Sequence, residues 1–458
     1  MFVKDILKKK IKSNSFLRSV LTVTSGTALS QLIVIVLSPL IMRLYSPTDM
    51  GILASYTAIT SILGIVIAGC YDQAVVLPET KRQTNAVVFL GVIIAAIGCG
   101  LITVVTIILD DALINVLNLQ SIQKIWFYLL GVFVFFVGVD SVLNQYAIKN
   151  AHFKLIATTQ VTQQVATNGL KVLLGFCKLG TFGLLTSMLF GQIIRVVRLF
   201  VTEFKNFFGT KDDLPSKKDV KYVMGRYKRF PLVSSWSALL NASSVQLPVI
   251  LFSSMFSPAV AGFYSLSHRI LSLPISLIGA SVGNVFLERA AKSQNNIVDL
   301  RRITIDVYKR LLLLGSIFFS FVVFYGDILF AFIFGSEWRE AGRFAQWMAI
   351  WLIFSLCYSP ISILYIITEK QFENLLFQII LFFSRISVAF IVPTYNDVGI
   401  VLPFFCMIST VVYFLGTLRL FQILKIHFFS IVKIYLYNFI AIFIIQFLIF
   451  FIVQFFLT

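Results

Sequence analysis

Residues Phe230–Lys292 read FPLVSSWSALLNASSVQLPVILFSSMFSPAVAGFYSLSHRILSLPISLIGASVGNVFLERAAK. Two apolar segments of membrane length meet within this stretch at Ser257-Pro258. The polar and small residues of both segments recur with the 3.6-residue period of a helix, so each helix is expected to have one polar face. These residues are Ser234, Ser237, Asn241 and Ser244 in the first segment, and Ser265, Arg269, Ser272, Ser276, Gly279 and Gly283 in the second.

Arg269 lies within the polar stripe of the second segment, far from both of its ends. A charged side chain at that depth in lipid is costly, so it is expected to face a cavity or a partner. A cavity that receives an anionic head group is one interpretation, and an internal ion pair is the other.

The composition is that of an integral membrane protein. Of the 458 residues, 58% are hydrophobic and 13% are charged, and the mean hydropathy is +0.91. Soluble domains carry about 25% charged residues. Apolar runs that can cross a hydrocarbon core about 30 Å thick recur from Leu17 onwards. The longest polar stretch, Glu203 to Arg229, leaves no room for a soluble domain between them.

The net charge of +18 raises the alternative of a nucleic-acid partner. Lys and Arg instead cluster in alternate loops, which is the positive-inside pattern of a multi-pass protein, so no nucleic-acid partner is expected. The same pattern places the basic N-terminus and the long 202–229 connection on the cytoplasmic side.

Hydropathy predicts an all-α polytopic protein with two six-helix bundles and one additional C-terminal helix. The bundles are expected over residues 1–210 and 211–425, and the additional helix lies within 426–458. Ser46-Pro47-x-x-x-Gly51 and Ser257-Pro258-x-x-x-Gly262 form an internal repeat, and parallel repeats around a central site are a transporter architecture. Besides the two helices of Phe230–Lys292, the predicted spans are about Ser19–Arg43, Gly51–Leu77, Asn85–Leu109, Lys124–Ala147, Leu155–Cys177, Thr181–Phe200, Leu311–Phe334, Phe344–Ile367, Phe372–Val392, Gly399–Leu420 and Ser430–Phe456, with a basic loop between Lys292 and Arg310.

Signals of enzymatic chemistry are weak. The three histidines have no partner at metal-ligand or triad spacing, and no P-loop or dinucleotide fingerprint is present. The five cysteines lie within apolar segments at unrelated spacing. We therefore expect a protein that is not an enzyme, with no metal site and no cofactor.

Charged residues inside the predicted spans are the main candidates for function. The cations Arg269, Lys171 and Arg385 are candidates for binding an anionic head group. The acids Asp72, Asp140 and Asp327 are candidates for ion coupling. Internal pairing, or a position near the membrane surface, is the alternative for each of them.

Three blocks of the chain resemble the oligosaccharide flippase family, the Wzx-type translocases of the MOP exporter superfamily. They are SGTALSQLIVIVLSPLIMRLYSPTDMGILASY with YDQAVVLPE (Ser25–Tyr56 and Tyr71–Glu79), RYKRFPLVSSWSALLNASSVQLPVILFSSMFSPAVAGFYSLSHRILSLPISLIG (Arg226–Gly279) and FGSEWREAGRFAQWMAIWLIFSLCYSPISILYIITEKQ (Phe334–Gln371). The resemblance extends over the first eleven helices. Members commonly carry Tyr-Glu where this chain has Tyr71-Asp72, a shorter acid.

The resemblance implies two bundles around a central cavity that opens alternately to each side of the bacterial cytoplasmic membrane. The implied substrate is an undecaprenyl-pyrophosphate-linked oligosaccharide, moved for O-antigen, capsule or exopolysaccharide assembly. Membrane lipids, a polysaccharide polymerase and a chain-length regulator are the implied partners. On this interpretation the cavity residues are Arg269, Lys171, Arg385, Asn241, Ser237, Gln31 and Gln164. The alternatives are an ion-coupled small-molecule or multidrug exporter of the same superfamily and a membrane polysaccharide polymerase.

Overall fold

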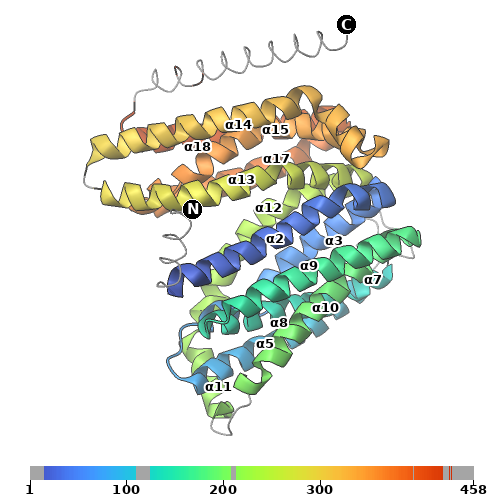
Figure 1. Ribbon diagram of the computed structural model, residues 1–458, viewed down its shortest axis with the longest axis vertical. Coiled ribbons are helices and arrows are strands. Elements are labelled where there is room, and N and C mark those ends of the chain that lie inside the picture. The colour runs from blue at the N-terminus through green and yellow to red at the C-terminus, as the bar shows by residue number, and fades with distance from the viewer. Residues whose placement is uncertain are drawn as a thin grey trace, which may run out of the picture. The chain divides into compact units, whose positions relative to one another are not determined.

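The described part of the chain is helical. The computed structural model describes residues 15–109, 124–207, 213–294, 296–395, 397–426, 433 and 435, and within these ranges there is no β-strand. Twelve helices in these ranges have at least 20 residues, as the sequence predicts (Figure 1). They are α2 (Ser15–Leu44), α3 (Pro47–Val66), α5 (Lys81–Ile108), α8 (Leu130–Lys149), α9 (Phe153–Phe176), α10 (Gly180–Phe207), α12 (Ser235–Met255), α13 (Pro258–Lys292), α14 (Ile297–Phe334), α15 (Arg339–Ile361), α17 (Gln371–Tyr395) and α18 (Val398–Ile423).

Nine helical segments within the described ranges are long and apolar enough to cross a membrane. The multi-pass architecture is therefore confirmed. The three long helices outside this set are α9, α13 and α17, which carry Lys171, Arg269 and Arg385.

The described residues form two compact units, the first ending at Ala259 and the second beginning at Val260. In the first unit α9 packs against α2 and α10, α5 packs against α8, and α12 packs on α3. Because of this last contact, α12 falls in the first unit, although the sequence assigns it to a second bundle beginning at residue 211. The bundle boundaries therefore stay a prediction.

The Ser-Pro repeat marks helix starts. Pro47 and Pro258 are the first residues of α3 and α13, where a missing N–H costs nothing. At α3, Ser46 and Asp49 form a capping box, which satisfies two free backbone N–H groups. Asp49 also accepts hydrogen bonds from the backbone N–H and hydroxyl of Thr181, at 2.8 and 2.6 Å, and so joins this turn to α10.

In the second unit α14 and α15 form a closely packed antiparallel pair, and α18 packs against α15 and α17. The close approach of α14 and α15 is made by Gly326 and Gly342. A Cβ at Gly342 would lie 2.3 Å from the carbonyl oxygen of Gly326. Such small-residue contacts allow helix backbones to approach within membranes.

Several predicted boundaries differ from the structure. The prediction of a basic loop between Lys292 and Arg310 is wrong, because α14 begins at Ile297 and most of this stretch is helical. The Asn296 side chain caps the helix by accepting hydrogen bonds from the N–H groups of Val298 and Asp299. The second predicted span ends early, at Val66, because Gly69 and Cys70 both have positive φ, at 58° and 55°. A short helix α4 (Tyr71–Ala74) follows this break.

Short helices account for the remaining described segments. α7 (Lys124–Tyr128) precedes α8, α11 (Lys217–Arg226) lies in the long connection, and α16 (Leu364–Ile367) follows α15. One turn of π-helix, η3, covers Phe230–Ser234, and one 3-10 turn, η4, covers Ser336–Trp338. The predicted thirteenth helix at 430–456 lies outside the described residues, apart from positions 433 and 435.

Candidate functional site: charged and polar residues on the long helices

An ion pair joins α8 and α10 in the first unit. The Arg195 Nε on α10 is 2.9 Å from the Asp140 Oδ1 on α8, and the two side chains are only 17% and 14% exposed. Both residues are inside segments that are apolar enough to span a membrane. Opposite charges at this depth compensate each other, since an isolated buried charge would cost several kcal/mol.

Amides from three helices surround this ion pair. Arg195 donates from Nη1 to the Gln163 Oε1 at 3.1 Å and from Nη2 to the Asn144 Oδ1 at 3.4 Å. The Gln163 Nε2 donates to the Gln192 Oε1 at 2.7 Å. We call Asp140, Asn144, Gln163, Gln192 and Arg195 the charge centre; it joins α8, α9 and α10. Such a network within apolar helices is costly unless its members satisfy one another.

Arg195 is the residue that sequence reasoning missed. The sequence predictions include Asp140 as an ion-coupling acid but no cation on the sixth span. The signal was present in GQIIRVVRLF, where Gln192 and Arg195 are spaced i, i+3 within an apolar segment. That spacing places them on one helix face. The pairing with α8, however, depends on the tertiary packing.

Asp72 bonds to Ser141, the residue that follows Asp140 of the charge centre in sequence. The Ser141 hydroxyl donates to the Asp72 Oδ2 at 2.6 Å, and Asp72 is half-buried. Asp72 belongs to the short helix α4, which is separated from α3 by the turn at Gly69 and Cys70, two residues with positive φ. Asp72 is therefore held against α8 by a hydroxyl group, whereas Asp140 on the same helix is held by a guanidinium.

α9 carries the most polar face of the first unit. The Thr27 hydroxyl of α2 donates to the Gln160 Oε1 at 3.2 Å. Gln164 is half-buried and accepts from the Asn168 amide at 3.2 Å. Lys171 is half-buried, one helical turn from the end of α9, and its carbonyl accepts from the Tyr45 hydroxyl at 2.7 Å.

The remaining predicted residues of the first unit are placed as follows. Gln31 on α2 and Asn241 on α12 are both exposed. Ser237 belongs to α12, one turn before Asn241, and its side chain lies outside the described residues. Gln31 and Asn241 are thus available to a ligand, in contrast to the charge centre.

In the second unit, Arg385 and Arg269 have opposite environments. Arg385 on α17 is buried, 6% exposed, with its guanidinium carbon 5.7 Å from the centre of the Trp351 ring. Trp351 stacks on both His268 and Tyr413. Arg385 is therefore part of a packed aromatic cluster, where its charge faces the electron-rich ring.

Arg269 on α13 is exposed. Across the described residues, no side chain forms an ion pair or hydrogen bond with its guanidinium. Its stripe partners are occupied by their own helix, since Ser265 and Ser276 donate to the carbonyls of Gly262 and Leu273. Arg269 therefore keeps its donors available.

Asp327 lies near the end of α14, away from the polar helix faces. It is 27% exposed, 4.0 Å from the Arg339 Nε, and accepts from the Gln346 amide at 3.4 Å. Its contacts belong to the α14–α15 turn. The structure thus gives Asp327 a surface ion pair, which is the alternative to a coupling role.

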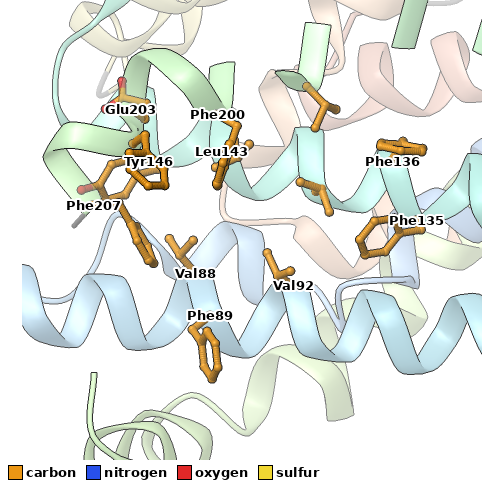
Figure 2. Close-up of a pocket in the computed structure, with 13 residues that line it drawn as sticks. Val88, Phe89, Val92, Phe135, Phe136, Leu143, Tyr146, Phe200, Glu203 and Phe207 are labelled. Carbon is orange, nitrogen blue, oxygen red and sulfur yellow. The ribbon is translucent and has the colours of Figure 1, made fainter. Parts of the chain in front are cut away.

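An apolar pocket of about 310 Å³ lies between α5, α8 and α10 in the first unit. Figure 2 shows Phe135 and Phe136 at one end of the pocket and Glu203, Tyr146 and Phe207 at the other. None of the predicted site residues lines it. A hydrocarbon lining of this kind suits an apolar chain rather than a charged group. Within the described ranges no three His, Cys, Asp or Glu side chains gather as metal ligands would.

Comparisons with known proteins bear on this arrangement of helices and charges. The profile of a family described as polysaccharide biosynthesis protein matches residues 40–343. A comparison with curated proteins finds no match.

Solved transporter structures share the fold. Lipid II flippase MurJ, in an inward closed conformation, matches with a TM-score of 0.69 and 14% identity over 93% of this chain and 92% of its own. An inward-facing multidrug resistance MATE family transporter of the MOP superfamily matches with a TM-score of 0.68 and 12% identity, over 85% and 93%. A MOP superfamily transporter from Pyrococcus furiosus matches with a TM-score of 0.54 and 14% identity, over 88% and 94%. The chain therefore belongs to the polysaccharide biosynthesis protein family, with the fold of MOP-superfamily transporters.

Proposed function

We propose that the protein is a flippase that moves undecaprenyl-pyrophosphate-linked oligosaccharide across the bacterial cytoplasmic membrane by alternating access. The product would serve O-antigen, capsule or exopolysaccharide assembly. Membership of the polysaccharide biosynthesis protein family supports the class of substrate. The observation that carries the proposal is the state of Arg269, an exposed residue well inside a long helix, whose side chain has no hydrogen-bond or ion-pair partner among the described residues.

The proposed role of Arg269 is to bind the diphosphate. A guanidinium binds phosphate oxygens through two parallel hydrogen bonds, and in a site with little water such bonds are strong. An anionic substrate would provide the compensating charge that Arg269 lacks in the described residues. Lys171 is proposed as a second cation for the same group. Arg385 is proposed to act by positioning, since it is buried against Trp351.

The sugars would be bound by neutral polar side chains. Hydroxyl groups of a sugar need hydrogen-bond partners when they leave water, because each unsatisfied group costs several kcal/mol in hydrocarbon. Gln31, Gln164 and Asn241 lie on α2, α9 and α12 with exposed or half-buried amides. Ser237 precedes Asn241 by one turn. We propose these four residues as sugar contacts.

Ion coupling is proposed for the acids. Asp72 is the strongest of the three, because it is half-buried and held by the hydroxyl of Ser141, whereas the other two lie beside arginines. Asp140 is held by Arg195, and Asp327 lies beside Arg339. Transport into sealed liposomes that ignores both proton and sodium gradients would exclude a coupling role for all three.

The decisive experiment is mass spectrometry of lipid-linked intermediates in a deletion strain. We expect lipid-linked glycan to accumulate, and we expect wild-type protein to clear it. Arg269→Ala at matched protein level should fail to clear it, and Arg269→Lys should clear it in part. Arg302→Ala is the control, because Arg302 is an exposed arginine in the first turns of α14. Normal surface polysaccharide with Arg269→Ala would overturn the assignment of Arg269.

A multidrug or small-solute exporter is the second candidate, because the MATE transporter matches almost as well as the lipid II flippase. That function predicts unchanged lipid-linked glycan in the deletion strain and increased sensitivity to exported compounds. A polysaccharide polymerase predicts single repeat units on the outer face. Under the flippase proposal, a separate polymerase and chain-length regulator would receive the product, and the N-terminus would be cytoplasmic.

A further inference from the structure

The long connection after α10 is docked on the first unit through the apolar face of α11. Val223 and Tyr227 are buried and belong to one hydrophobic cluster with Tyr71 and Leu90. The Tyr71 hydroxyl donates to the carbonyl of Met224 at 3.3 Å. α11 is thus a fixed element of this unit, next to α5 (Figure 1).

The described acids of this connection are directed onto α5. Asp213 forms an ion pair with Lys81 at 2.6 Å, and Asp219 forms one with Arg82 at 2.7 Å. Asp219 is also the acidic member of the capping box with Ser216 at the start of α11. Both carboxylates are therefore used within the protein and do not neutralise the outer face of α11.

The exposed face of the connection is consequently basic. Six exposed Lys and Arg side chains lie on this face, and no carboxylate of a described residue lies at ion-pair distance from any of them. Exposed apolar side chains lie between these cations. We call this surface the basic face. Its basic residues are Lys217, Lys218, Lys221, Arg226, Lys228 and Arg229, and its exposed apolar residues are Leu214, Tyr222 and Met224.

The position of the basic face indicates its partner. Lys81 and Arg82 open the membrane-spanning helix α5, and the span of α10 ends at Phe204, shortly before the connection. α11 is therefore held at the end of two spans, where lipid headgroups lie. Leu214, Tyr222 and Met224 are 40%, 51% and 48% exposed, and apolar side chains between cations are typical of helices that lie in a membrane interface.

We propose that the basic face binds the headgroups of anionic phospholipids, with Tyr222 and Met224 entering the interface. Each Lys or Arg near an anionic surface adds an attraction that salt screens. Because α11 is anchored to α5 by two ion pairs and a buried cluster, lipid bound there stabilises the first unit directly. The proposal is independent of the transported substrate.

The test uses the full-length protein in neutral detergent micelles, with phosphatidylglycerol or phosphatidylcholine added. We expect phosphatidylglycerol to raise the melting temperature well above the value with phosphatidylcholine, and high salt to remove most of the difference. The variant K217Q/K218Q/K221Q should lose at least half of the rise. The variant K217R/K218R/K221R should keep it, because charge rather than shape is recognised.

The matched control is R302Q/K309Q/R310Q, which removes three exposed cations from the beginning of α14. This control should retain the full effect of phosphatidylglycerol. If phosphatidylglycerol raised the melting temperature of K217Q/K218Q/K221Q as much as that of the wild-type protein, the proposal would be overturned. The proposal would also be overturned if the melting temperature of the wild-type protein did not change with phosphatidylglycerol but rose with polyglutamate. That result would assign the basic face to an acidic protein partner instead.

Discussion

Arg195 on α10 and Asp140 on α8 form an ion pair in the interior of the first unit, with 2.9 Å between Nε and Oδ1. Gln163 and Asn144 accept further hydrogen bonds from the same guanidinium. Both charges lie within apolar spans, so each one needs the other.

Removal of either member of this pair should be strongly destabilising. Asp140→Asn or Arg195→Gln alone leaves one buried charge uncompensated, at a cost of about 3–5 kcal/mol. The double variant should cost much less than the sum of the two, since no charge remains. Thermal unfolding of the four proteins in one detergent gives the coupling energy between the two sites. Additive effects would show that the ion pair contributes little.

Arg269→Ala should leave the stability of the protein nearly unchanged, unlike the removal of Asp140 or Arg195. Arg269 is exposed and makes no polar contact with described residues, so its removal is expected to change the free energy of unfolding by less than about 0.5 kcal/mol. Clearance of lipid-linked glycan should nevertheless be lost. The melting temperature is measured on the purified variant, and the clearance of lipid-linked glycan is measured in the deletion strain that expresses the same variant. A large fall in melting temperature would assign Arg269 to the fold rather than to the substrate.

Gly342→Ala should disrupt the α14–α15 pair. The added Cβ would lie 2.3 Å from the Gly326 oxygen and 2.4 Å from the Asp327 Cα, which are backbone atoms that cannot move alone. We expect a loss of about 1–3 kcal/mol or more from overpacking. Gly100→Ala on α5 is the control, because nothing lies within 4 Å of the added Cβ. Thermal unfolding of both variants checks this, and equal stability would contradict the close crossing.

Docking of α11 should depend on pH through Asp219. Hydrogen bonds from the Ser216 hydroxyl and backbone N–H, and the ion pair with Arg82, lower the pKa of Asp219 below its ordinary value. Since the folded state has the lower pKa, the stabilisation is complete above the unfolded pKa of about 3.9 and is lost as pH falls through the folded value.

Limited proteolysis between residues 213 and 229 checks this dependence. Cleavage of wild-type protein should increase at pH 3 relative to pH 6, measured with a protease that is active at both. Asp219→Asn should be cleaved readily at both values, since its side chain carries no charge at either. A wild-type cleavage rate that does not change with pH would contradict the role of Asp219.

The fold class was determined by the sequence alone. Long apolar segments separated by polar turns leave few alternatives in a membrane, because only helices satisfy their backbone hydrogen bonds within one segment. The helix starts at Pro47 and Pro258 are also local, since proline and the capping box act over a few neighbouring residues. The break after Val66 was not predicted, because hydropathy does not register the positive φ of Gly69 and Cys70.

The environment of each charge was decided only by the tertiary structure. Helical spacing shows which residues share a face, but not which other helix that face meets. Asp140 and Asp72 look alike in sequence, yet one is paired with Arg195 and the other with the Ser141 hydroxyl. Arg385 and Arg269 likewise differ, since one is packed on Trp351 and the other is exposed. The physical reason is that electrostatic partners are set by contacts between helices that are distant in sequence.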